Sequence, residues 1–479
     1  MATVEAPSTT RRIFLAGEWI DTGSSLEVRS PYSGDVVATV ARAGAEEARR
    51  AIDAAVEAMH EPLPPWRRAE ILERVAQLVR EHGEELAQTI CAEAGKPIKA
   101  ARVEAARAVN TYTLAAGEAR TLTGESVPIR GTQPGDGHFA WIVRVPIGVI
   151  GAITPFNFPL NLVAHKLAPA LAAGCAVVLK PASQTPVSAL RLAALCEEAG
   201  LPFGWLSVLP GKASEIGDVL VEDDRVRMLT FTGSAEVGWE LRSRAARKKV
   251  TLELGNASPV LVEPDADLEL AAAKVATHAF SFAGQTCVSI QRVYVHREVV
   301  DDFLARLVPK VEALSVGDPA ADATDVGPVI DRGNRERIRE WREEATSGGA
   351  EIVTGGVEEE GLLRPTVLTG VAPEMKVCAQ EIFGPVCSVI PYESLGEAFG
   401  LANGTEYGLQ AAIFTRSIEP AVKASGALEF GSVMINEAPE WRADQMPYGG
   451  TKASGNTKEG PAYTVREMTE ERLIVLGGV

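Results

Sequence analysis

The sequence predicts an α/β fold with a doubly wound, Rossmann-type sheet and a second α/β lobe. The first observation is a series of apolar, β-branched runs that alternate with helical segments: 145–155, 175–181, 205–211, 227–233 and 249–255. Such runs, joined by helices, indicate a parallel sheet covered on both faces. The second is a similar series at 258–264, 291–296, 411–417 and 431–436. The third is length, because 479 residues exceed what one hydrophobic core usually organises.

The remaining elements follow in chain order. Residues 1 to about 12 are predicted to form a loose tail. Gly44 to Arg107 has helical periodicity, which is interrupted at EPLPPW (61–66). A further helix is expected at about 298–313. The final segment ERLIVLGGV predicts a terminal strand that is tied down by pairing, in this chain or with another subunit.

Charge and cysteine usage exclude several classes of function. Sixty-four acidic against 47 basic residues give a net charge of −17, which disfavours nucleic acid or an anionic membrane as partner. The six cysteines form no CxxC pair and no finger-like spacing with histidine, so we expect neither a disulfide framework nor a metal site. The most apolar stretch, 145–179, contains His165, Lys166 and several prolines, and therefore does not read as a membrane span. We expect a cytoplasmic protein.

Cys287 is the candidate nucleophile. It lies in FAGQTCVSIQR (282–292), between a predicted helix and a strand. A free cysteine is usually a buried small hydrophobe, but the flanking glycine, glutamine, threonine and serine suit a reactive thiol better than an inert apolar pocket. A thiolate adds to an aldehyde carbon, provided that its pKa is lowered or a base lies nearby.

Two polar residues at strand ends complete the candidate chemistry. Glu253 ends the strand VTLELG, and a carboxylate within an otherwise apolar strand must be paired, protonated or functional. As a general base, Glu253 would activate water. Asn157 in TPFNFP (154–159) is a turn residue or, alternatively, an amide donor that stabilises an oxyanion.

Three weaker signals indicate a dinucleotide. FTGSAEVG (231–238) follows a strand and opens a helix, so Gly233 would permit close backbone approach and the helix start would receive a phosphate. Lys180 ends the strand CAVVLKP, and the residues EIFGP (381–385) combine an acid with an aromatic ring. Each of these segments has an ordinary structural reading when it is taken alone.

Taken together, the segments resemble the aldehyde dehydrogenase superfamily in order and across essentially the whole chain. The matching segments are EAGKP (93–97), TPFNFP, LKPASQTP (179–186), FTGSAEVG, LELG (252–255), GQTC (284–287), EIFGP and MPYGGTKASG (446–455). The resemblance implies roles for Cys287 as nucleophile, Asn157 with the Cys287 N–H as oxyanion site, and Glu253 as general base. It implies cofactor-binding roles for Thr154, Phe156, Lys180, Ser183, Gly233, Ser234, Gly238, Gly255, Glu381 and Phe383.

The same resemblance implies an architecture and a reaction. A cofactor domain would comprise 1–120 and 143–255, a catalytic domain 256–440, and a small β oligomerisation flap 121–142 and 460–479. An aldehyde would be oxidised to the carboxylic acid with NAD or NADP, through a thiohemiacetal and a thioester on Cys287. Members usually form homodimers or homotetramers, so we expect a homo-oligomer.

Departures from the family pattern concern cofactor and substrate. ELGGK of the family is ELGNA here, with Asn256 and Ala257. Ser183 stands where NAD-preferring relatives often have Glu; without that carboxylate a 2′-phosphate is not repelled, which favours NADP. Arg442 would pair with an anionic substrate tail or would brace its loop through Asp444 or another carboxylate.

Two alternative functions remain at this stage. A CoA-acylating aldehyde dehydrogenase would release the acyl group to CoA instead of water, and such members tend to lack the glutamate base, whereas Glu253 is retained. A catalytically silent binding or structural relative would be expected to have lost Cys287, Asn157 or Glu253, and all three are present.

Overall fold

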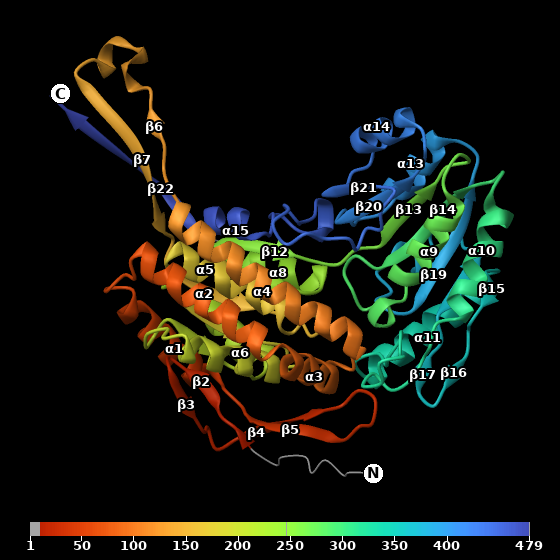
Figure 1. The fold of residues 1–479 in the computed structure, drawn as a ribbon, viewed down its shortest axis with the longest axis horizontal. Helices are drawn as coiled ribbons and strands as arrows, with labels where there is room; N and C mark the ends of the chain where they lie inside the picture. Colours follow the sequence, from red (N-terminus) through yellow and green to blue (C-terminus); the bar gives the residue numbers. More distant parts are fainter. Residues whose placement is uncertain (1–9, 246, 479) are drawn as a thin grey trace.

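The computed structural model describes residues 10–245 and 247–478, which form two α/β lobes and a projecting three-stranded sheet (Figure 1). The seven-stranded sheet of the first lobe has the order β12-β11-β8-β9-β10-β2-β3. Five parallel strands, all of them predicted, form most of it: β8 (Val149–Ile153), β9 (Val177–Lys180), β10 (Leu206–Val208), β11 (Val226–Thr232) and β12 (Lys249–Glu253). The sequence did not reveal the antiparallel edge pair β2 (Ile13–Leu15) and β3 (Glu18–Ile20), which are only three residues long each.

Helices cover both faces of this sheet, which confirms the doubly wound fold. One face carries α1 (Ala45–Ala58), α7 (Ala213–Glu222) and α8 (Ala235–Arg244); the other carries α2 (Pro65–Glu81), α3 (Gly83–Ala94), α4 (Ile98–Thr121), α5 (Asn161–Ala173) and α6 (Val187–Glu198). The predicted break at EPLPPW falls between α1 and α2, where Pro65 takes the first helical position. Gly95, in the left-handed conformation, ends α3.

The second lobe contains another seven-stranded sheet, of order β15-β18-β19-β14-β13-β20-β21. Its strands are β13 (Ser258–Val262), β14 (Ile290–His296), β15 (Glu351–Thr354), β18 (Thr366–Thr369), β19 (Val386–Tyr392), β20 (Gln410–Phe414) and β21 (Ser432–Ile435), with a small hairpin of β16 (Glu358–Glu359) and β17 (Leu362–Leu363). Its helices are α9 (Leu268–His278), α10 (Val300–Glu312), α11 (Arg332–Ser347), α12 (Lys376–Ala379), α13 (Leu395–Asn403) and α14 (Ile418–Ala427). The four predicted strands and the helix predicted at about 298–313 are confirmed.

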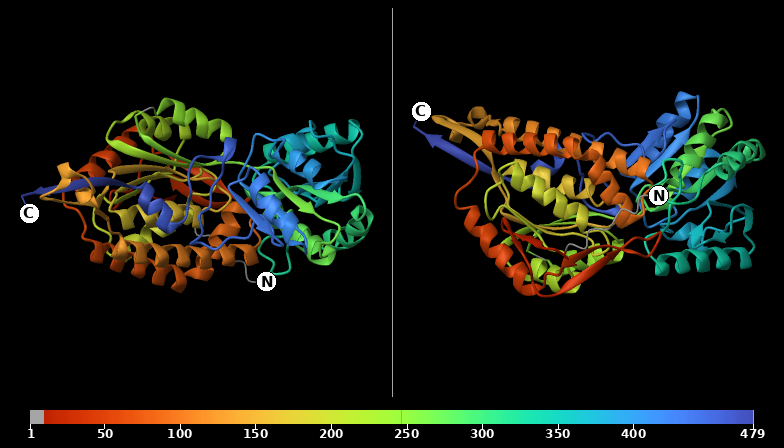
Figure 2. Two further views of the ribbon diagram at one scale, coloured as in Figure 1. Left: turned by 90° about the horizontal axis from the view of Figure 1, so that it is seen from above. Right: turned by 60° about the horizontal axis from the view of Figure 1, so that its bottom comes forward.

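The last strand, β22 (Thr469–Gly477), follows the short helix α15 (Pro461–Glu467) and pairs antiparallel with β7 (His138–Pro146), which in turn pairs with β6 (Ser126–Val127). Figures 1 and 2 show that this sheet projects from the first lobe, away from the second. The predicted terminal strand therefore pairs within the chain, and β22 is an edge strand.

At the N-terminus, β1 (Thr10–Arg11) pairs in parallel with β5 (Val36–Ala41), which also pairs with β4 (Ser25–Arg29). The loose-tail prediction is thus wrong for its last residues, because backbone pairing holds β1; residues 1–9 lie outside the described part. Among the helices of residues 10–245 and 247–478, none combines the length and apolar character needed to cross a bilayer.

The two lobes are joined where β12 leads into β13. The C-terminal segment returns to this junction, since Leu254 N donates to Ser454 O at 3.0 Å and Ser454 Oγ donates to Gly255 O at 2.6 Å. The segment 446–455 therefore lies beside the end of β12, where Glu253 is located. Distant parts of the sequence meet at this point.

Candidate active site

Cys287 is held by a strained turn between α9 and β14. Phe282 and Ala283 have positive φ values of 48° and 54°, and Gly284 follows at 70°. A Cβ on Gly284 would lie 2.1 Å from the Gly384 carbonyl oxygen, so only glycine fits there. Such conformations persist only where the surroundings impose them, which is typical of functional sites.

Gln285 provides those constraints. Its Nε2 donates to Phe282 O and Pro328 O, and its Oε1 accepts from Ile330 N at 2.8 Å. A buried amide with three partners fixes the backbone two residues before the cysteine.

The Cys287 sulfur contacts a tyrosine that the sequence analysis did not single out. Tyr448 Oη lies 2.8 Å from Cys287 Sγ in a hydrogen bond. Burial raises the pKa of the Cys287 thiol to about 12, while the hydrogen bond from Tyr448 lowers it.

Asn157 lies against the cysteine turn. Its Nδ2 donates to Gln285 O at 2.9 Å, and its side chain is buried. An amide nitrogen carries two donors, and one bond to Gln285 leaves the second for another acceptor. The turn that carries Asn157 is fixed in part by Phe156, whose ring meets the Phe383 ring edge-on at a centroid distance of 5.8 Å.

Glu253 is a buried carboxylate whose two oxygens have no hydrogen-bond donor among the described residues. It ends β12, and a Cβ on Gly449 would lie 2.7 Å from its Oε1, so the residue after Tyr448 is in direct contact with it. Burial, and then the nearby Glu459, raise the pKa of Glu253 well above its usual value, whereas Lys166 lowers it.

These contacts bring the three predicted catalytic residues together. Asn157 is bonded to the carbonyl of Gln285, Cys287 follows two residues later and is bonded to Tyr448, and Gly449 next to Tyr448 touches Glu253. A thiol, an amide donor and a carboxylate thus come from three distant segments. Acyl chemistry through a covalent intermediate uses groups of these three kinds.

The predicted phosphate turn has the geometry of a helix N-terminus with close packing. Ser234 caps α8, accepting from Val237 N, and a Cβ on Gly233 would lie 2.5 Å from the Phe231 ring. At Gly238 a Cβ would lie 2.5 Å from Leu254 Cδ2, so that glycine lets α8 pack close to the end of β12. Backbone amides at such a helix start can bind a phosphate.

Lys180 is the last residue of β9, and Ser183 follows shortly after it at the same edge of the sheet. The Lys180 ammonium is buried and donates to the neighbouring Pro181 O at 3.0 Å; burial lowers its pKa to about 8. Ser183 is exposed, and its Oγ donates to Gly211 O at 2.9 Å. Thr154 Oγ1 at the end of β8 is buried with no partner among the described residues.

Glu381 and Gly255 are in contact across the lobe junction. A Cβ on Gly255 would lie 2.3 Å from Glu381 Oε2, and Glu381 Oε1 accepts from Asn256 N at 2.9 Å. Burial raises the pKa of Glu381 to about 7. Phe383 has a positive φ of 45°, which turns this loop toward Phe156.

Asn256, a departure from the family pattern, is accommodated without an unpaired group. Its Nδ2 donates to Ser258 Oγ at 2.7 Å and to Gln410 O at 3.2 Å, and its Oδ1 accepts from Leu409 N. These bonds tie the junction after Glu253 to the start of β20.

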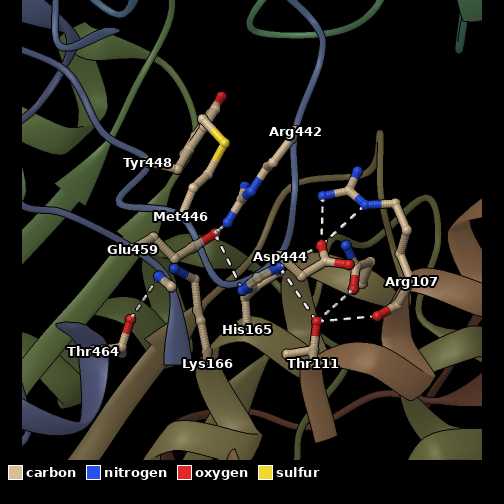
Figure 3. A network of polar contacts seen from close by, with 12 residues as sticks. Arg107, Thr111, His165, Lys166, Arg442, Asp444, Met446, Tyr448, Glu459 and Thr464 are labelled. Carbon is tan, nitrogen blue, oxygen red and sulfur yellow. Dashed lines mark hydrogen bonds and ion pairs between the residues drawn. The ribbon is translucent and has the colours of Figure 1, made fainter. Parts of the chain in front are cut away.

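Arg442 belongs to a buried polar network (Figure 3). Its Nη2 donates to Glu459 Oε1 at 2.9 Å, and its guanidinium carbon lies 4.0 Å from the centroid of the Tyr448 ring. Asp444 instead accepts two bonds from Arg107 at 2.9 and 3.0 Å. The bracing carboxylate is therefore Glu459 and not Asp444.

Sequence reasoning missed several members of this network: Arg107, Lys166, Tyr448 and Glu459. The sequence contains a signal for Lys166, because it is a charged residue within the largely apolar segment that forms α5. His165 lies 3.6 Å from Asp444 and 3.7 Å from Glu459. Although burial raises the pKa of Glu459, His165, Arg442 and Lys166 lower it to about 2.

Comparison with known proteins gives the family. The model of the aldehyde dehydrogenase family matches residues 19–474. A 3-sulfolactaldehyde dehydrogenase of Priestia aryabhattai is 45% identical over 464 residues, which are 97% of each chain.

Two solved structures are similar over almost the whole chain. Aldehyde dehydrogenase 21 of Physcomitrella patens, in complex with the reaction product succinate, has a TM-score of 0.95 and 38% identity and covers 98% of this chain and 99% of its own. The NADP-dependent glyceraldehyde-3-phosphate dehydrogenase of Bacillus halodurans, complexed with NADP, has a TM-score of 0.96 and 37% identity. The similarity covers 98% of this chain and 100% of that chain. The predicted fold and family are confirmed: the chain belongs to the aldehyde dehydrogenase family.

Proposed function

We propose that this aldehyde dehydrogenase oxidises a short aldehyde with an anionic tail to the carboxylic acid, through a thioester on Cys287 that water hydrolyses. The observation that carries the proposal is the convergence of Cys287, Asn157 and Glu253 beside the buried Arg442 network. Two of the named relatives support an anionic tail on the substrate, since one is a dehydrogenase of a sulfonated aldehyde and the other is in complex with its reaction product succinate.

The residues present suit a nicotinamide dinucleotide. Thr154 Oγ1 is a buried hydroxyl without a partner, and the buried Lys180 ammonium bonds only its neighbour's carbonyl. Gly233, Ser234 and Gly238 would hold the pyrophosphate at the start of α8, and Phe156, Gly255, Glu381 and Phe383 would contact the nicotinamide riboside. We assign the first lobe to the cofactor and the second to catalysis, with the boundaries expected from the sequence.

The chain's own residues account for the acyl chemistry. The Cys287 thiolate adds to the aldehyde carbon, and the carbonyl oxygen becomes an oxyanion that Asn157 Nδ2 and the Cys287 N–H stabilise. The nicotinamide cofactor, when bound, supplies the two-electron oxidation by accepting hydride from that carbon. Water then attacks the resulting thioester, Glu253 takes a proton from the water, and the carbon–sulfur bond breaks to release the acid and the thiolate.

Glu253 favours hydrolysis over transfer to CoA. Its two oxygens have no donor among the described residues, and its raised pKa makes it, when ionised, a stronger base than an ordinary carboxylate. We expect reduced nicotinamide to form continuously from a sulfonated or carboxylated short aldehyde when no CoA is present. A panel of anionic, phosphorylated, aliphatic and aromatic aldehydes, assayed with each cofactor, tests this; turnover that requires CoA would contradict it.

Arg442 is proposed to bind the tail of the substrate. Of its five N–H donors only one, on Nη2, has a hydrogen-bond acceptor among the described residues, and Nε is buried without a partner. Arg107, Arg442 and Lys166 lie in the same network as the carboxylates of Asp444 and Glu459 (Figure 3). The free donors of Arg442 suit one sulfonate or carboxylate.

Ser183 is proposed to admit NADP. We expect Ser183→Glu to raise the KM for NADP by about tenfold, because a carboxylate beside the 2′-phosphate adds roughly 1–2 kcal/mol of repulsion. The KM for NAD should stay the same or fall. Steady-state kinetics with both cofactors measure this, with Ser183→Gln as the uncharged control of similar size; an equal effect on both cofactors would refute the assignment.

The projecting sheet is proposed to mediate homo-oligomerisation. Leu473 and Val475 on β22 are each about half exposed, at 55% and 48%, and β22 has a free edge among the described strands. An exposed apolar edge strand that remained uncovered would promote aggregation, and a second copy of the chain would cover it.

We expect Leu473→Asp to weaken self-association by at least about a hundredfold, because it places a charge in an apolar interface. Light scattering coupled to size exclusion should give a dimer or tetramer for the unsubstituted chain and a monomer for the variant. Phe203→Ser, at an exposed site away from the flap, serves as control. A monomeric unsubstituted chain would contradict the proposal.

A further inference from the structure

The hydroxyl of Tyr448 is placed on the Cys287 sulfur by several independent contacts. The backbone of Tyr448 exchanges hydrogen bonds with Glu459, donating to Glu459 O at 2.8 Å and accepting from Glu459 N at 2.5 Å. On one face of the ring the Arg442 guanidinium carbon lies 4.0 Å from the ring centroid. The side chain is buried, with 4% of the residue exposed. The Oη–Sγ distance of 2.8 Å is therefore set by the surrounding structure.

The groups around the sulfur explain why such a donor matters. Glu253 and Glu381 face Cys287 and oppose its ionisation, and burial opposes it further; Arg442 and Tyr448 favour it. Asn157 bonds the Gln285 carbonyl and not the sulfur. Among the described residues, Tyr448 is thus the side chain whose hydrogen bond reaches Sγ directly.

We propose that the Tyr448 hydroxyl is a catalytic group that donates a hydrogen bond to the Cys287 thiolate, raising the fraction of reactive thiolate and fixing the direction of the sulfur. The phenol keeps its proton throughout, and the proton lost from the thiol passes to solvent. The inference rests on the proposed role of Cys287 as nucleophile.

Arg442 strengthens this donor through the ring. Burial raises the pKa of Tyr448 well above its usual value, and the neighbouring thiol raises it further, but the positive charge of Arg442 lowers it. A cation over an aromatic face draws electron density from the ring, which makes the O–H a better donor. Phenylalanine at position 448 would keep the stacking with Arg442 and the packing, so Tyr448→Phe removes the hydroxyl alone.

The test is the pH dependence of Cys287 alkylation in the enzyme without substrate. Iodoacetamide reacts with the thiolate, whose sulfur forms a bond to carbon as iodide leaves, and mass spectrometry of the Cys287 peptide follows the rate. In Tyr448→Phe we expect the rate at each pH between 7 and 9 to fall about tenfold, which corresponds to a rise of about one unit in the pKa of the thiol, the usual effect of a hydrogen bond to a charged group.

Tyr294→Phe is the matched control, because it removes another buried hydroxyl, which donates to Leu401 O at 3.1 Å and does not touch Cys287. Its alkylation profile should equal that of the unsubstituted enzyme. If Tyr448→Phe does not fold, 3,5-difluorotyrosine at position 448 tests the same point in the opposite direction, since a more acidic phenol is a stronger donor while it keeps its proton and should raise the alkylation rate at pH 7.

An unchanged profile in Tyr448→Phe, or faster alkylation, would overturn the proposal and would leave Tyr448 as a packing residue or a cover over the sulfur. Failure of the proposed function has a different signature. In that case Cys287→Ala would keep its dehydrogenase activity, whatever the alkylation profile of Tyr448→Phe.

Discussion

Glu253→Gln is expected to stop the enzyme after one turnover. One equivalent of reduced nicotinamide should form per active site, and the following steady-state rate should be about 10³- to 10⁴-fold lower than that of the unsubstituted enzyme. This is the upper range for loss of a general base. The physical reason is that thiolate addition and oxidation do not need this carboxylate, whereas water cannot attack the thioester without it. Stopped-flow absorbance of the reduced cofactor measures the burst and the later rate.

Two variants separate the roles in this experiment. Cys287→Ala should give neither burst nor turnover, because no covalent intermediate can form. Glu253→Asp keeps a carboxylate and should recover part of the steady-state rate. A burst that disappears in Glu253→Gln would show that Glu253 acts before the thioester, contrary to the proposal.

Arg442→Gln is expected to lower kcat/KM about a hundredfold more for a sulfonated or carboxylated aldehyde than for propanal, because only the anionic tail loses a charged partner, whereas any effect through Tyr448 and Cys287 is common to both substrates. The comparison is internal: a change in folding or in cofactor binding would affect both substrates. Steady-state kinetics with matched anionic and neutral aldehydes give the ratio.

The variant also leaves Glu459 without its 2.9 Å partner, so a second substitution is informative. Arg442→Lys keeps the charge but loses the planar fork of donors. Its kcat/KM for the anionic aldehyde should therefore lie between those of the unsubstituted enzyme and Arg442→Gln. Equal losses for both aldehydes would assign Arg442 to bracing the 442–459 segment alone.

The sequence predicted the parts of the fold that have strong local signals. The five parallel strands of the first lobe are continuous apolar runs bounded by glycine or proline, and each was found. In the second lobe β15 and β18 were missed, since each has only four residues, and so was β19, whose apolar run includes Cys387, Ser388 and Pro391. Short or mixed strands depend on their neighbours for stability, and that information is not local.

The same limit applies to the site. Cys287, Asn157 and Glu253 lie in segments whose residue types suggest chemistry, and the family resemblance indicated their roles. Tyr448 lies in the matching segment 446–455, but neither its residue type nor that of Glu459 indicates a role. That role comes from lying against Cys287 and Arg442, 161 and 17 residues away in sequence. Asn256 shows another side of this limit, because the three partners of its side chain come from Ser258, Leu409 and Gln410, two of them about 150 residues away in sequence.

The account depends on a covalent acyl group on one sulfur, and peptide mapping of the Glu253→Gln enzyme tests this most directly. After mixing with cofactor and aldehyde and rapid acid quenching, mass spectrometry should find the acyl mass on the peptide that contains Cys287, in an amount equal to the burst. An acyl group on another residue, or none despite formation of reduced nicotinamide, would contradict it.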